Sequence, residues 1–419
     1  MDKGRLHGSL GPMRGGRSWR GRGLVVVGSI LAGALAAAAP ACVGDDPKAG
    51  AGADATPDVP TPIADTGADT ASPPDGSPDA PRPACDGSTD CDPKNCGRAG
   101  HDCEGGACVG GKCGFVELAT GQRNPSHLVA DGEHVYWVNA GSLALCDGST
   151  SDGAVMRVKR DGTGLATLAQ GQACPATIAL RAGDVYWAVR GTGAFADGAI
   201  RRTPKDGSGS PADVAQVAAA VSFVVDDDAL YYTSGAAPNG VFRLPLRLGA
   251  TPTLMATNQD PLSRLGHNGT ELFWSVPIRG DVFRLAKDFT PAGSAGLVPA
   301  AYHATGSYPG DVRAQPDGAA VFWANRDEHS IMRLATAGDA GAAPIYPNQG
   351  RPRTLVVDDA VYWWTLGQSA LYRGSTDGTE SARLLAAEKP TNYVNLATDA
   401  TAIYVAHTDT GRILKLVKP

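Results

Sequence analysis

The stretch ADGEHVYWVNAG (130–141) contains the pattern that decides the fold, Val135-Tyr136-Trp137. The same short run of apolar and aromatic residues returns six times further along the chain, as VYW (185–187), LYY (230–232), LFW (272–274), VFW (321–323), VYW (361–363) and IYV (403–405). Successive copies lie 40 to 50 residues apart, with a mean near 45. A period of this length with one aromatic strand per period is typical of a β-propeller.

Each repeat divides into four short strands. The first repeat reads SHLVAD (126–131), VYWVN (135–139), GAVMRVKR (153–160) and LATLAQ (165–170), with Asp161-Gly162 as a hairpin turn before the fourth strand. Four antiparallel strands make one blade, so residues 115–419 predict an all-β, seven-bladed propeller. The aromatic strand is a continuous apolar run, so we expect it to be buried on both sides where neighbouring blades meet.

The last repeat contains only three strands before Pro419. The segment FVELATGQ (115–122), which precedes the first repeat, is similar to LATLAQGQ (165–172) in a fourth-strand position. It is therefore predicted to supply the missing strand of blade seven. Such a closure leaves no open sheet edge between the first and last blades.

The charge of the chain is distributed unevenly. The first 41 residues contain six Lys or Arg and one acid, and the remaining residues contain 31 basic and 42 acidic side chains, a net charge of −11. This acidic balance argues against nucleic acid and against anionic lipid surfaces as partners.

The N-terminus predicts export. A basic region is followed by sixteen uncharged residues (24–39), which are short for a membrane span, and then by small residues. Residues 1–41 are therefore predicted to be a signal peptide. Cys42 directly follows the small residues and resembles the lipidated cysteine of bacterial lipoproteins, although Ala39 stands where that family prefers Leu. This resemblance implies an outer membrane lipoprotein or a cell-surface protein that contacts the membrane only through the lipid on Cys42.

Residues 42–84 are predicted to be a disordered linker. They are almost entirely Ala, Pro, Asp, Thr, Gly and Ser, and they contain no aromatic side chain. Such a segment cannot bury enough apolar surface to offset its conformational entropy.

Residues 85–114 form a candidate disulfide module with six cysteines: Cys85, Cys91, Cys96, Cys103, Cys108 and Cys113. No C-x-x-C pair is present, so an exported chain favours three disulfides over zinc, and six cysteines permit fifteen pairings. The nearby acids Asp86, Asp90, Asp92 and Asp102 do not have the spacing of an EF-hand, so solvated turns are favoured over calcium. The module resembles one that precedes propeller-like repeats in surface lipoproteins of high-GC Gram-negative bacteria.

Two further cysteines, Cys146 and Cys174, lie in predicted loops of the propeller. With Cys42 lipidated and six cysteines in the module, they remain as an even pair. Both loops are expected on the same face, so a disulfide is geometrically plausible if their Cα atoms come within about 7 Å.

The repeats resemble the Tyr-Trp-Thr-Asp propellers of lipoprotein receptors across residues 115–419. The Thr-Asp half of that motif is replaced here, as VYWVN (135–139) and VYWAV (185–189) show. In the family this Asp helps to link the blades, so the resemblance implies that the links here are chiefly apolar.

No catalytic motif is present in the sequence: it contains no G-x-S-x-G, no H-E-x-x-H and no P-loop. Acids such as Asp131, Asp226 and Asp358 mostly precede the aromatic strand, where Asp is favoured as a turn residue. We therefore expect no catalytic residue, cofactor or metal ligand, and a monomeric binding or scaffold module for a protein or glycan of the cell envelope. The alternative is a propeller enzyme of the lactonase or lyase type with a divalent metal in its channel.

The strand order also predicts which face binds a ligand. Loops between second and third strands share a face with the connections between blades, and these loops are the long ones; we call this the long-loop face. Ordering such loops before binding lowers the cost of recognition. The candidate contact residues on this face are Arg190, Arg279, Tyr308, Arg326, His329, Arg351 and His407.

Overall fold

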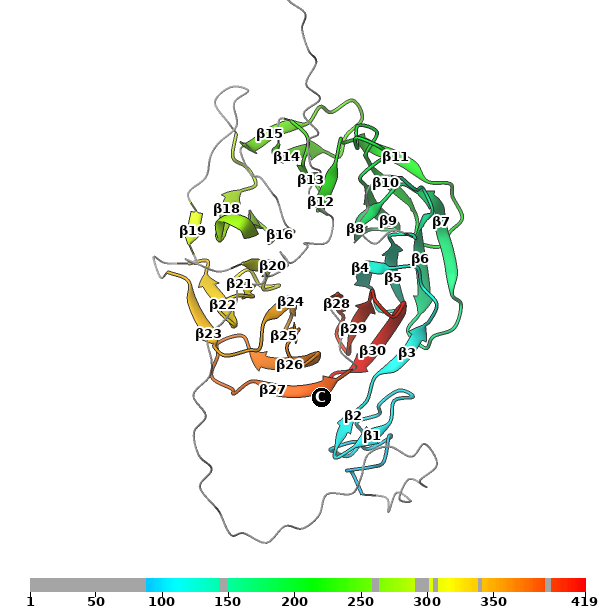
Figure 1. Ribbon diagram of the computed structural model, residues 1–419, viewed down its shortest axis with the longest axis vertical. Helices are drawn as coiled ribbons and strands as arrows, with labels where there is room; N and C mark the ends of the chain where they lie inside the picture. Colours follow the sequence, from blue (N-terminus) through cyan, green and yellow to red (C-terminus); the bar gives the residue numbers. More distant parts are fainter. Residues whose placement is uncertain are drawn as a thin grey trace, which may run out of the picture. The chain divides into compact units, whose positions relative to one another are not determined.

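The computed structural model arranges seven four-stranded antiparallel sheets as blades around one axis (Figure 1). It describes residues 88–142, 149–237, 239–257, 264–290, 301–303 (backbone only), 308–337, 341–388 and 393–419. The predicted signal peptide and linker, with Cys42, Cys85 and Cys146, lie outside the described residues. Within the described ranges, no helix has the length and apolar character needed to span a membrane. The predicted all-β, seven-bladed propeller is confirmed.

In each blade the first strand lies nearest the axis and the fourth lies outermost (Figure 1). The first strands are β4 (Pro125–Ala130), β8 (Pro175–Arg181), β12 (Ala220–Val225), β16 (Leu265–His267), β20 (Pro309–Ala314), β24 (Pro352–Val357) and β28 (Val394–Thr398). The second strands are β5 (His134–Asn139), β9 (Asp184–Val189), β13 (Ala229–Ser234), β17 (Glu271–Val276), β21 (Ala320–Asn325), β25 (Ala360–Thr365) and β29 (Ala402–His407). The third strands are β6 (Gly153–Lys159), β10 (Ala199–Pro204), β14 (Gly240–Pro245), β18 (Asp281–Ala286), β22 (Ser330–Ala335), β26 (Ala370–Ser375) and β30 (Arg412–Val417). The fourth strands are β7 (Ala166–Gln172), β11 (Ala212–Gln216), β15 (Thr253–Thr257), β19 (Ala301–His303), β23 (Ala343–Tyr346), β27 (Arg383–Ala387) and β3 (Val116–Ala119).

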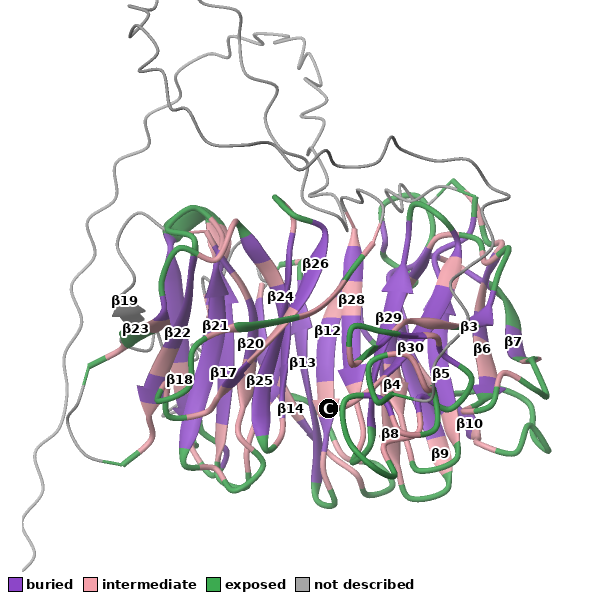
Figure 2. Ribbon diagram, turned by 90° about the horizontal axis from the view of Figure 1, so that it is seen from below, coloured by how far each residue is buried: buried purple, intermediate pink, exposed green. Residues whose placement is uncertain are grey.

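The second strands carry the core of the molecule, as the buried segments in Figure 2 show. Trp137, Trp187 and Trp274 are fully buried, and the equivalent residues of the other blades, Tyr232, Trp323, Trp363 and Val405, are buried as well. Seven apolar clusters lie between neighbouring blades, and each combines side chains from both of them. Burial on both sides explains why these strands have no polar alternation.

A basic residue of the third strand pairs across the sheet with the central aromatic of the second strand in every blade. The pairs are Tyr136 with Arg157, Tyr186 with Arg202, Tyr231 with Arg243, Phe273 with Arg284, Phe322 with Arg333, Tyr362 with Arg373 and Tyr404 with Lys415. Positions directly opposite each other on neighbouring antiparallel strands bring these basic side chains next to the aromatic ones. The same basic residue is visible at this position in every repeat of the sequence.

The ring closes as predicted. Strand β3 pairs with β30, and Val116 lies opposite Lys415. Each first strand also contacts the first strand of the next blade, and β28 contacts β4 in the same way. Residues from the two ends of the propeller therefore form one blade (Figure 1).

Ion pairs join neighbouring blades in addition to the apolar clusters. The Asp in the turn after a first strand bonds the basic residue that follows the third strand of the next blade, an arrangement we call the blade latch. Latches join Asp131 to Lys205 (3.2 Å), Asp226 to Lys287 (2.7 Å), Asp399 to Arg160 (3.6 Å) and Asp358 to Lys418. The expected apolar links are present at every junction between blades, and these ion pairs add to them at four junctions.

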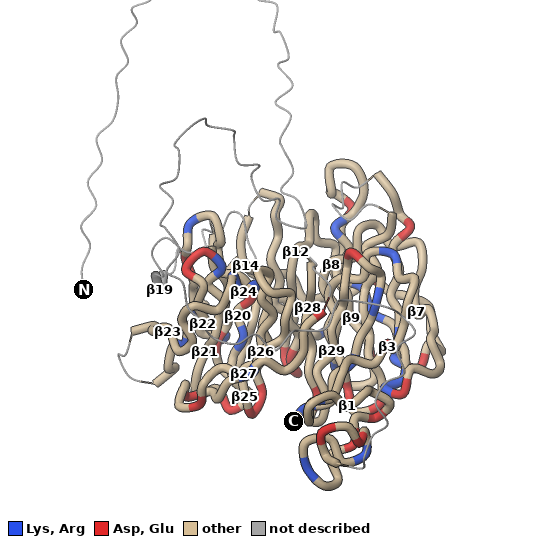
Figure 3. Tube along the Cα trace, turned by 60° about the horizontal axis from the view of Figure 1, so that its bottom comes forward, with Lys and Arg blue, Asp and Glu red and all other residues tan. Residues whose placement is uncertain are grey.

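The same aspartates also hold their turns. Asp131 accepts hydrogen bonds from the backbone N–H groups of Glu133 (3.0 Å) and His134 (2.8 Å), and Asp226 accepts from Asp228 and Ala229 in the same way. The predicted turn role is confirmed, and Figure 3 shows acidic segments at turns near β25. One carboxylate thus shapes a turn and links two blades.

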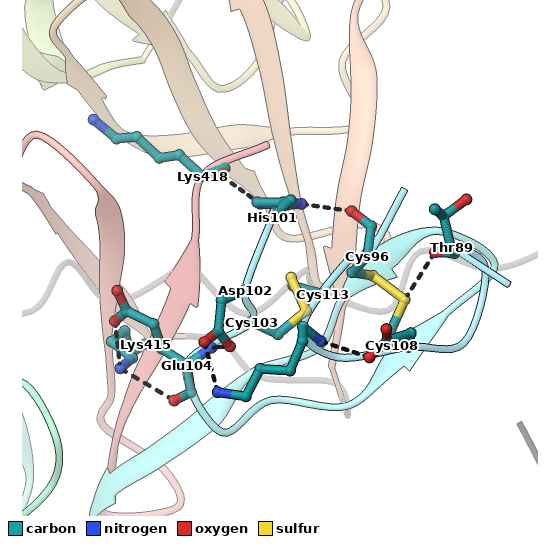
Figure 4. Close-up of a disulfide and its surroundings, with 12 residues drawn as sticks. Thr89, Cys96, His101, Asp102, Cys103, Glu104, Cys108, Cys113, Lys415 and Lys418 are labelled. Atoms are coloured by element: carbon teal, nitrogen blue, oxygen red, sulfur yellow. Dashed lines mark hydrogen bonds and ion pairs between the residues drawn. A yellow bond between two sulfur atoms is a disulfide. The ribbon is translucent and has the colours of Figure 1, made fainter. Parts of the chain in front are cut away.

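The cysteine module packs against blades six and seven. Its hairpin of β1 (Cys108–Val109) and β2 (Lys112–Cys113) is crosslinked by the disulfides Cys96–Cys108 and Cys103–Cys113 (Figure 4). Cys91 is also disulfide-bonded. The four described cysteines of these two bonds belong to the apolar cluster between blades six and seven.

Polar contacts hold the same junction between the module and the last strand. His101 bonds the carbonyl oxygen of Lys418 through Nε2 (2.8 Å), and Lys415 Nζ contacts the Glu104 carboxylate (3.1 Å) (Figure 4). The module therefore contacts the last strand, β30, with which β3 pairs to close the ring.

Candidate functional site

One polar side chain in each first strand, or directly before it in the case of Arg264, lies at the inner edge of its blade. Each is the residue immediately before the buried apolar residue that pairs with the second strand, as His127 precedes Leu128. We call this set the axial ring, and it consists of His127, Thr177, Ser222, Arg264, Asp311, Thr354 and Asn395. All seven side chains can form hydrogen bonds, although they come from an otherwise apolar part of the repeat.

Three side chains of the axial ring form hydrogen bonds with backbone groups at the inner edge of the next blade. The backbone N–H of Ile178 donates to His127 Nδ1 (3.1 Å), and that of Leu265 donates to Ser222 Oγ (3.0 Å). Thr177 Oγ1 donates to the carbonyl of Val221 (3.0 Å). First strands are edge strands with unpaired backbone groups, so the polar ring has a structural role in these three blades.

A second part of the ring spans the axis. Arg264 of blade four forms an ion pair through Nε with Asp311 of blade five (2.8 Å), and its terminal nitrogen donates to Asn395 Oδ1 of blade seven. Thr354 of blade six donates to the second oxygen of Asp311 (2.7 Å). These four side chains connect four blades. They bond one another, whereas those of His127, Thr177 and Ser222 bond backbone groups of the neighbouring strand.

Two more arginines lie beside this network. Arg313 follows Asp311 on β20 and contacts its carboxylate (3.5 Å), and the Arg353 guanidinium stacks over the Tyr393 ring (4.8 Å). Three guanidinium groups therefore act on one carboxylate. Burial disfavours the charged form of Asp311, but Arg264 and Arg313 keep its pKa below its ordinary value.

The same charges affect His127. Burial, followed by the positive charges of Arg264 and Arg313, lowers the pKa of His127 well below its ordinary value of 6.5. The imidazole is therefore neutral at neutral pH. Because Nδ1 accepts the Ile178 N–H, the ring hydrogen is assigned to Nε2, which is a donor.

The predicted long-loop face is formed as the strand order required. In blade two, the N–H of Arg190, after the second strand, donates to the carbonyl of Cys174, before the first strand (3.1 Å). In blade five, Arg326 donates to Tyr308 in the same way (3.2 Å). Both kinds of loop therefore meet on one face.

The candidate contact residues differ in their accessibility. Arg190 (3% exposed) stacks on Phe195, and His407 (0% exposed) bonds Thr410 through Nδ1. Burial removes these two from the set that a ligand can reach on this face. Burial also lowers the pKa of His407, so it is a neutral core residue.

The other candidates are polar side chains in loops, except Arg279, which ends the short 3-10 helix η1 (Pro277–Arg279). Arg279 pairs with Asp281 (2.7 Å), whereas Arg326 stacks over Tyr308 (4.0 Å) and bonds Asp327. His329 and Arg351 adopt left-handed backbone conformations, with φ of 52° and 61°. These five remain on the long-loop face, separate from the axial ring.

Cys174 is disulfide-bonded. Its predicted partner Cys146 lies outside the described residues, so this pairing stays a prediction. The backbone of Cys174 has a φ of 54°, and Asn124, Ala219 and Arg351 show similar values at the same position of their blades. This left-handed residue turns the chain from one blade into the next first strand.

The axial ring was not predicted from the sequence. The available signal was a polar residue directly before an apolar one at the start of each repeat, as in Arg264-Leu265 and Asp311-Val312. Such a pair is common at strand starts and becomes informative only when seven of them are superimposed.

The residue types in the ring limit its chemistry. Calcium and magnesium sites need several oxygen ligands, mostly carboxylates. Asp311 is the single carboxylate of the axial ring, and arginines surround it. Among the described residues, the one group of three close metal-ligating side chains is Cys96, Cys103 and Cys113, which are in disulfides.

Comparisons with known proteins show similarity of fold. No family model and no curated protein matches the chain. A catalytically inactive variant of virginiamycin B lyase from Staphylococcus aureus, with quinupristin, is similar at a TM-score of 0.56 and 13% identity over 73% of this chain and 99% of that chain. A streptogramin B lyase structure gives a TM-score of 0.56 and 12% identity over 72% and 97% of the two chains. A putative 6-phosphogluconolactonase from Bacteroides uniformis gives 0.47 and 17% identity over 64% and 87%.

Proposed function

We propose that this chain is a cell-envelope lipoprotein whose propeller is a binding module for a protein or glycan. The observation that supports binding is the composition of the axial ring: hydrogen-bonding and cationic side chains surround one carboxylate, Asp311. Such a constellation recognises polar groups without supplying the paired acid and base of a hydrolase. The ligand enters from the long-loop face.

The lactonase or lyase alternative with a divalent metal receives less support. A divalent cation at the ring would be held by Asp311 and repelled by Arg264, Arg313 and Arg353. The similarity to lyases is a similarity of fold at 12–13% identity, and propellers host both enzymes and binders. Binding is therefore the function that the geometry favours.

The anchoring part of the proposal depends on the N-terminal sequence. The signal-like segment and Cys42 would place a lipid at the start of the mature chain, and residues 43–84 would separate the propeller from the membrane. The Tyr-Trp pattern of the second strands supports kinship with Tyr-Trp-Thr-Asp repeats. We propose that the protein is monomeric and is exposed at the cell surface or the outer membrane.

A capture experiment tests the binding function. The protein is expressed without residues 1–42, immobilised and exposed to envelope extracts, and bound protein or glycan is identified. Arg326→Glu and Arg351→Glu on the long-loop face are expected to abolish capture. Asp161→Lys and Asp206→Lys in the turns on the opposite face are the matched charge reversals and should leave capture intact.

The opposite result would overturn the assignment of faces. Loss of capture in the Asp161→Lys and Asp206→Lys variants, with normal capture by the arginine variants, would place the binding surface on the short-turn side. Equal capture by all variants would remove the long-loop face from the interface. Melting temperatures of all variants separate loss of binding from loss of folding.

A further inference from the structure

We propose that closure of the ring depends on oxidation of the cysteine module. The disulfides Cys96–Cys108 and Cys103–Cys113 hold β3 against β30, and a chain with four thiols at these positions leaves blade seven open. Such a device controls the assembly of the propeller and is independent of the ligand that the propeller binds.

The closing strand β3 receives little help from the connectivity of the chain. In blade one the fourth strand, β7, follows β6 through the short turn at Asp161-Gly162, so these two strands start close together. The closing pair is different: Glu117 of β3 and Arg412 of β30, which form an ion pair at 3.1 Å, are 295 positions apart. Bringing distant segments together costs more chain entropy than forming a hairpin. Strand β3 has four residues to offset this cost, and its register shifts between Glu117 and Ala119.

The module is joined directly to this strand. Cys113 ends β2, and β3 begins at Val116. Phe115, which lies between them, packs against Trp364 of blade six with ring centroids 6.5 Å apart. Because only two residues separate Cys113 from β3, the disulfide of Cys113 fixes where the closing strand starts.

The two disulfides are part of the apolar junction between blades six and seven. Cys96 and Cys103 are 0% exposed, and Cys108 and Cys113 are buried in the same cluster. Between residues 88 and 114, the regular structure that is described consists of β1 and β2, with two residues each. A unit of fewer than about 40 residues usually needs crosslinks or a metal to stay folded. The module therefore keeps its shape through its disulfides.

Two residues close to a disulfide dock the module on the last strand (Figure 4). Lys415 Nζ donates to the carboxylate of Glu104, which follows Cys103, at 3.1 Å. His101, two positions before Cys103, contacts the carbonyl oxygen of Lys418 through Nε2 at 2.8 Å. The disulfide partner of Cys103 lies just before β3, so this crosslink ties the segment docked on β30 to the closing strand.

A further contact fixes the module on blade six. Lys112, which precedes Cys113 in β2, donates from Nζ to the backbone carbonyl of Leu384 in β27 at 3.2 Å. The module thus contacts blades six and seven at once, and the crosslinks keep its docking segments at a constant distance from each other. A reduced module loses this spacing, and β3 loses the restraint that places it beside β30.

Oxidation of the module proceeds by thiol–disulfide exchange with an external disulfide, such as glutathione disulfide. One thiolate of the chain attacks the external disulfide and releases one thiolate, and a second thiolate of the chain then displaces the other. For each disulfide formed, two electrons pass from the chain to the oxidant, and the two released thiolates take up the protons that the chain thiols lost. With the proposed export signal, closure takes place after transfer into an oxidising compartment.

Hydrogen exchange measured by mass spectrometry tests the proposal on the purified protein. A variant that combines Cys96→Ala, Cys103→Ala, Cys108→Ala and Cys113→Ala is expected to exchange the amides of residues 115–122 at least about tenfold faster than wild type. Strand β13 of blade three, which shares no junction with blade seven, should change less than about twofold.

Cys174→Ala is the matched control, because it removes a disulfide-bonded cysteine of the propeller that lies outside the module. It should leave exchange in residues 115–122 unchanged. Protection of 115–122 in the fourfold variant equal to that of wild type would overturn the proposal. Equal acceleration in β13 and in 115–122 would also overturn it, because the module would then stabilise the propeller in general and not its closure.

Refolding of the wild-type protein provides a second measurement if the fourfold variant does not fold. The protein is unfolded in urea with a phosphine, which is oxidised to the phosphine oxide as it reduces each disulfide to two thiols, and is returned to buffer that contains the phosphine. Residues 115–122 are expected to exchange rapidly in this state, with β13 protected, and to regain protection when glutathione disulfide replaces the phosphine. Slow exchange of 115–122 while mass spectrometry finds free thiols at the four positions would refute the role of the disulfides.

Discussion

Lys415 in the last strand donates a hydrogen bond from Nζ to the backbone carbonyl of Arg160 in the first blade, at 3.0 Å. The equivalent contact between blades one and two joins Arg157 to the carbonyl of Lys205. The junction that closes the ring is therefore built like a junction between blades that are consecutive in the sequence. Closure depends on repeated side chains as well as on β3.

Replacing Lys415 should loosen this closure. Lys415 is 1% exposed and also contacts the Glu104 carboxylate, so Lys415→Met is expected to lower the free energy of unfolding by about 2 kcal/mol. Urea denaturation measures the change. Lys159→Met, at an exposed position of β6, is the control and should cost less than about 0.5 kcal/mol. Similar costs for both variants would contradict the role of Lys415.

Removing the closing strand should have a larger effect. A chain that starts at Arg123 lacks β3 and leaves β30 as an exposed edge, so we expect a lower melting temperature for the complete propeller. A thermal melt compares it with a chain that starts at Phe115. If only the amplitude of a minor transition changed, β3 would be an appendage and not a structural part of blade seven.

The core prediction concerns Trp137. This side chain is 0% exposed, and its Nε1–H donates to Asn139 (3.0 Å) and to Gln122 (3.2 Å) near the closing strand. Trp137→Ala should cost about 3–5 kcal/mol, as for large aromatic truncations in cores. A cost below about 1 kcal/mol in chemical denaturation would be incompatible with this packing.

The blade latch predicts a pH dependence. Burial opposes ionisation of Asp226, but the hydrogen bond from Lys287 and two backbone N–H groups place its pKa below the ordinary 3.8. A carboxylate with a lowered folded-state pKa stabilises the protein above its unfolded pKa, and this contribution is lost as the pH falls through the folded value. Asp226→Asn should therefore cost about 1 kcal/mol at pH 7, and the difference from wild type should shrink below pH 3.8.

Urea midpoints measured between pH 7 and pH 3 provide this comparison. Asp227→Asn in the same turn is the control, because the Asp227 side chain is 98% exposed. A constant difference between wild type and Asp226→Asn down to pH 3 would show that the ion pair does not stabilise the blade junction.

The anchoring proposal is tested at Cys42. Cys42→Ser removes the thiol that would carry the lipid, so the protein should move from the membrane fraction to the soluble fraction and lose incorporation of labelled fatty acid. Incorporation equal to that of wild type would disprove lipidation at this residue. Cys174→Ser serves as the control for general effects of removing a cysteine.

Much of the fold could be predicted because the information is repeated along the chain. Seven continuous apolar and aromatic strands at a regular spacing indicate strands that are buried on both sides. Short turns such as Asp161-Gly162 indicate that consecutive strands are antiparallel. Closure through 115–122 was predictable because the segment is similar to a fourth strand. The ionic links were not predicted, because Asp131 and Lys205 have no local signal that assigns them to each other.

The candidate site required the structure, as Arg264 and Asn395 show. They are 131 positions apart, and each precedes a buried leucine in the way that an ordinary strand residue does. Nothing local distinguishes an Arg at an inner edge from an Arg in a loop. The long-loop candidates were chosen from strand order alone, which indicates a face but not the burial of Arg190 or His407.

The sequence by itself determined the repeat, the strand order and the pairing of the two chain ends, because hydrophobic periodicity and turn chemistry are local and recur in every blade. Only the tertiary structure decided that seven polar residues meet at one axis, with Arg264 against Asp311 and Asn395. The physical reason is that closing a ring places the inner strands of distant repeats within hydrogen-bond distance. The chemistry of the axial ring therefore arises from residues that are neighbours only in the folded molecule.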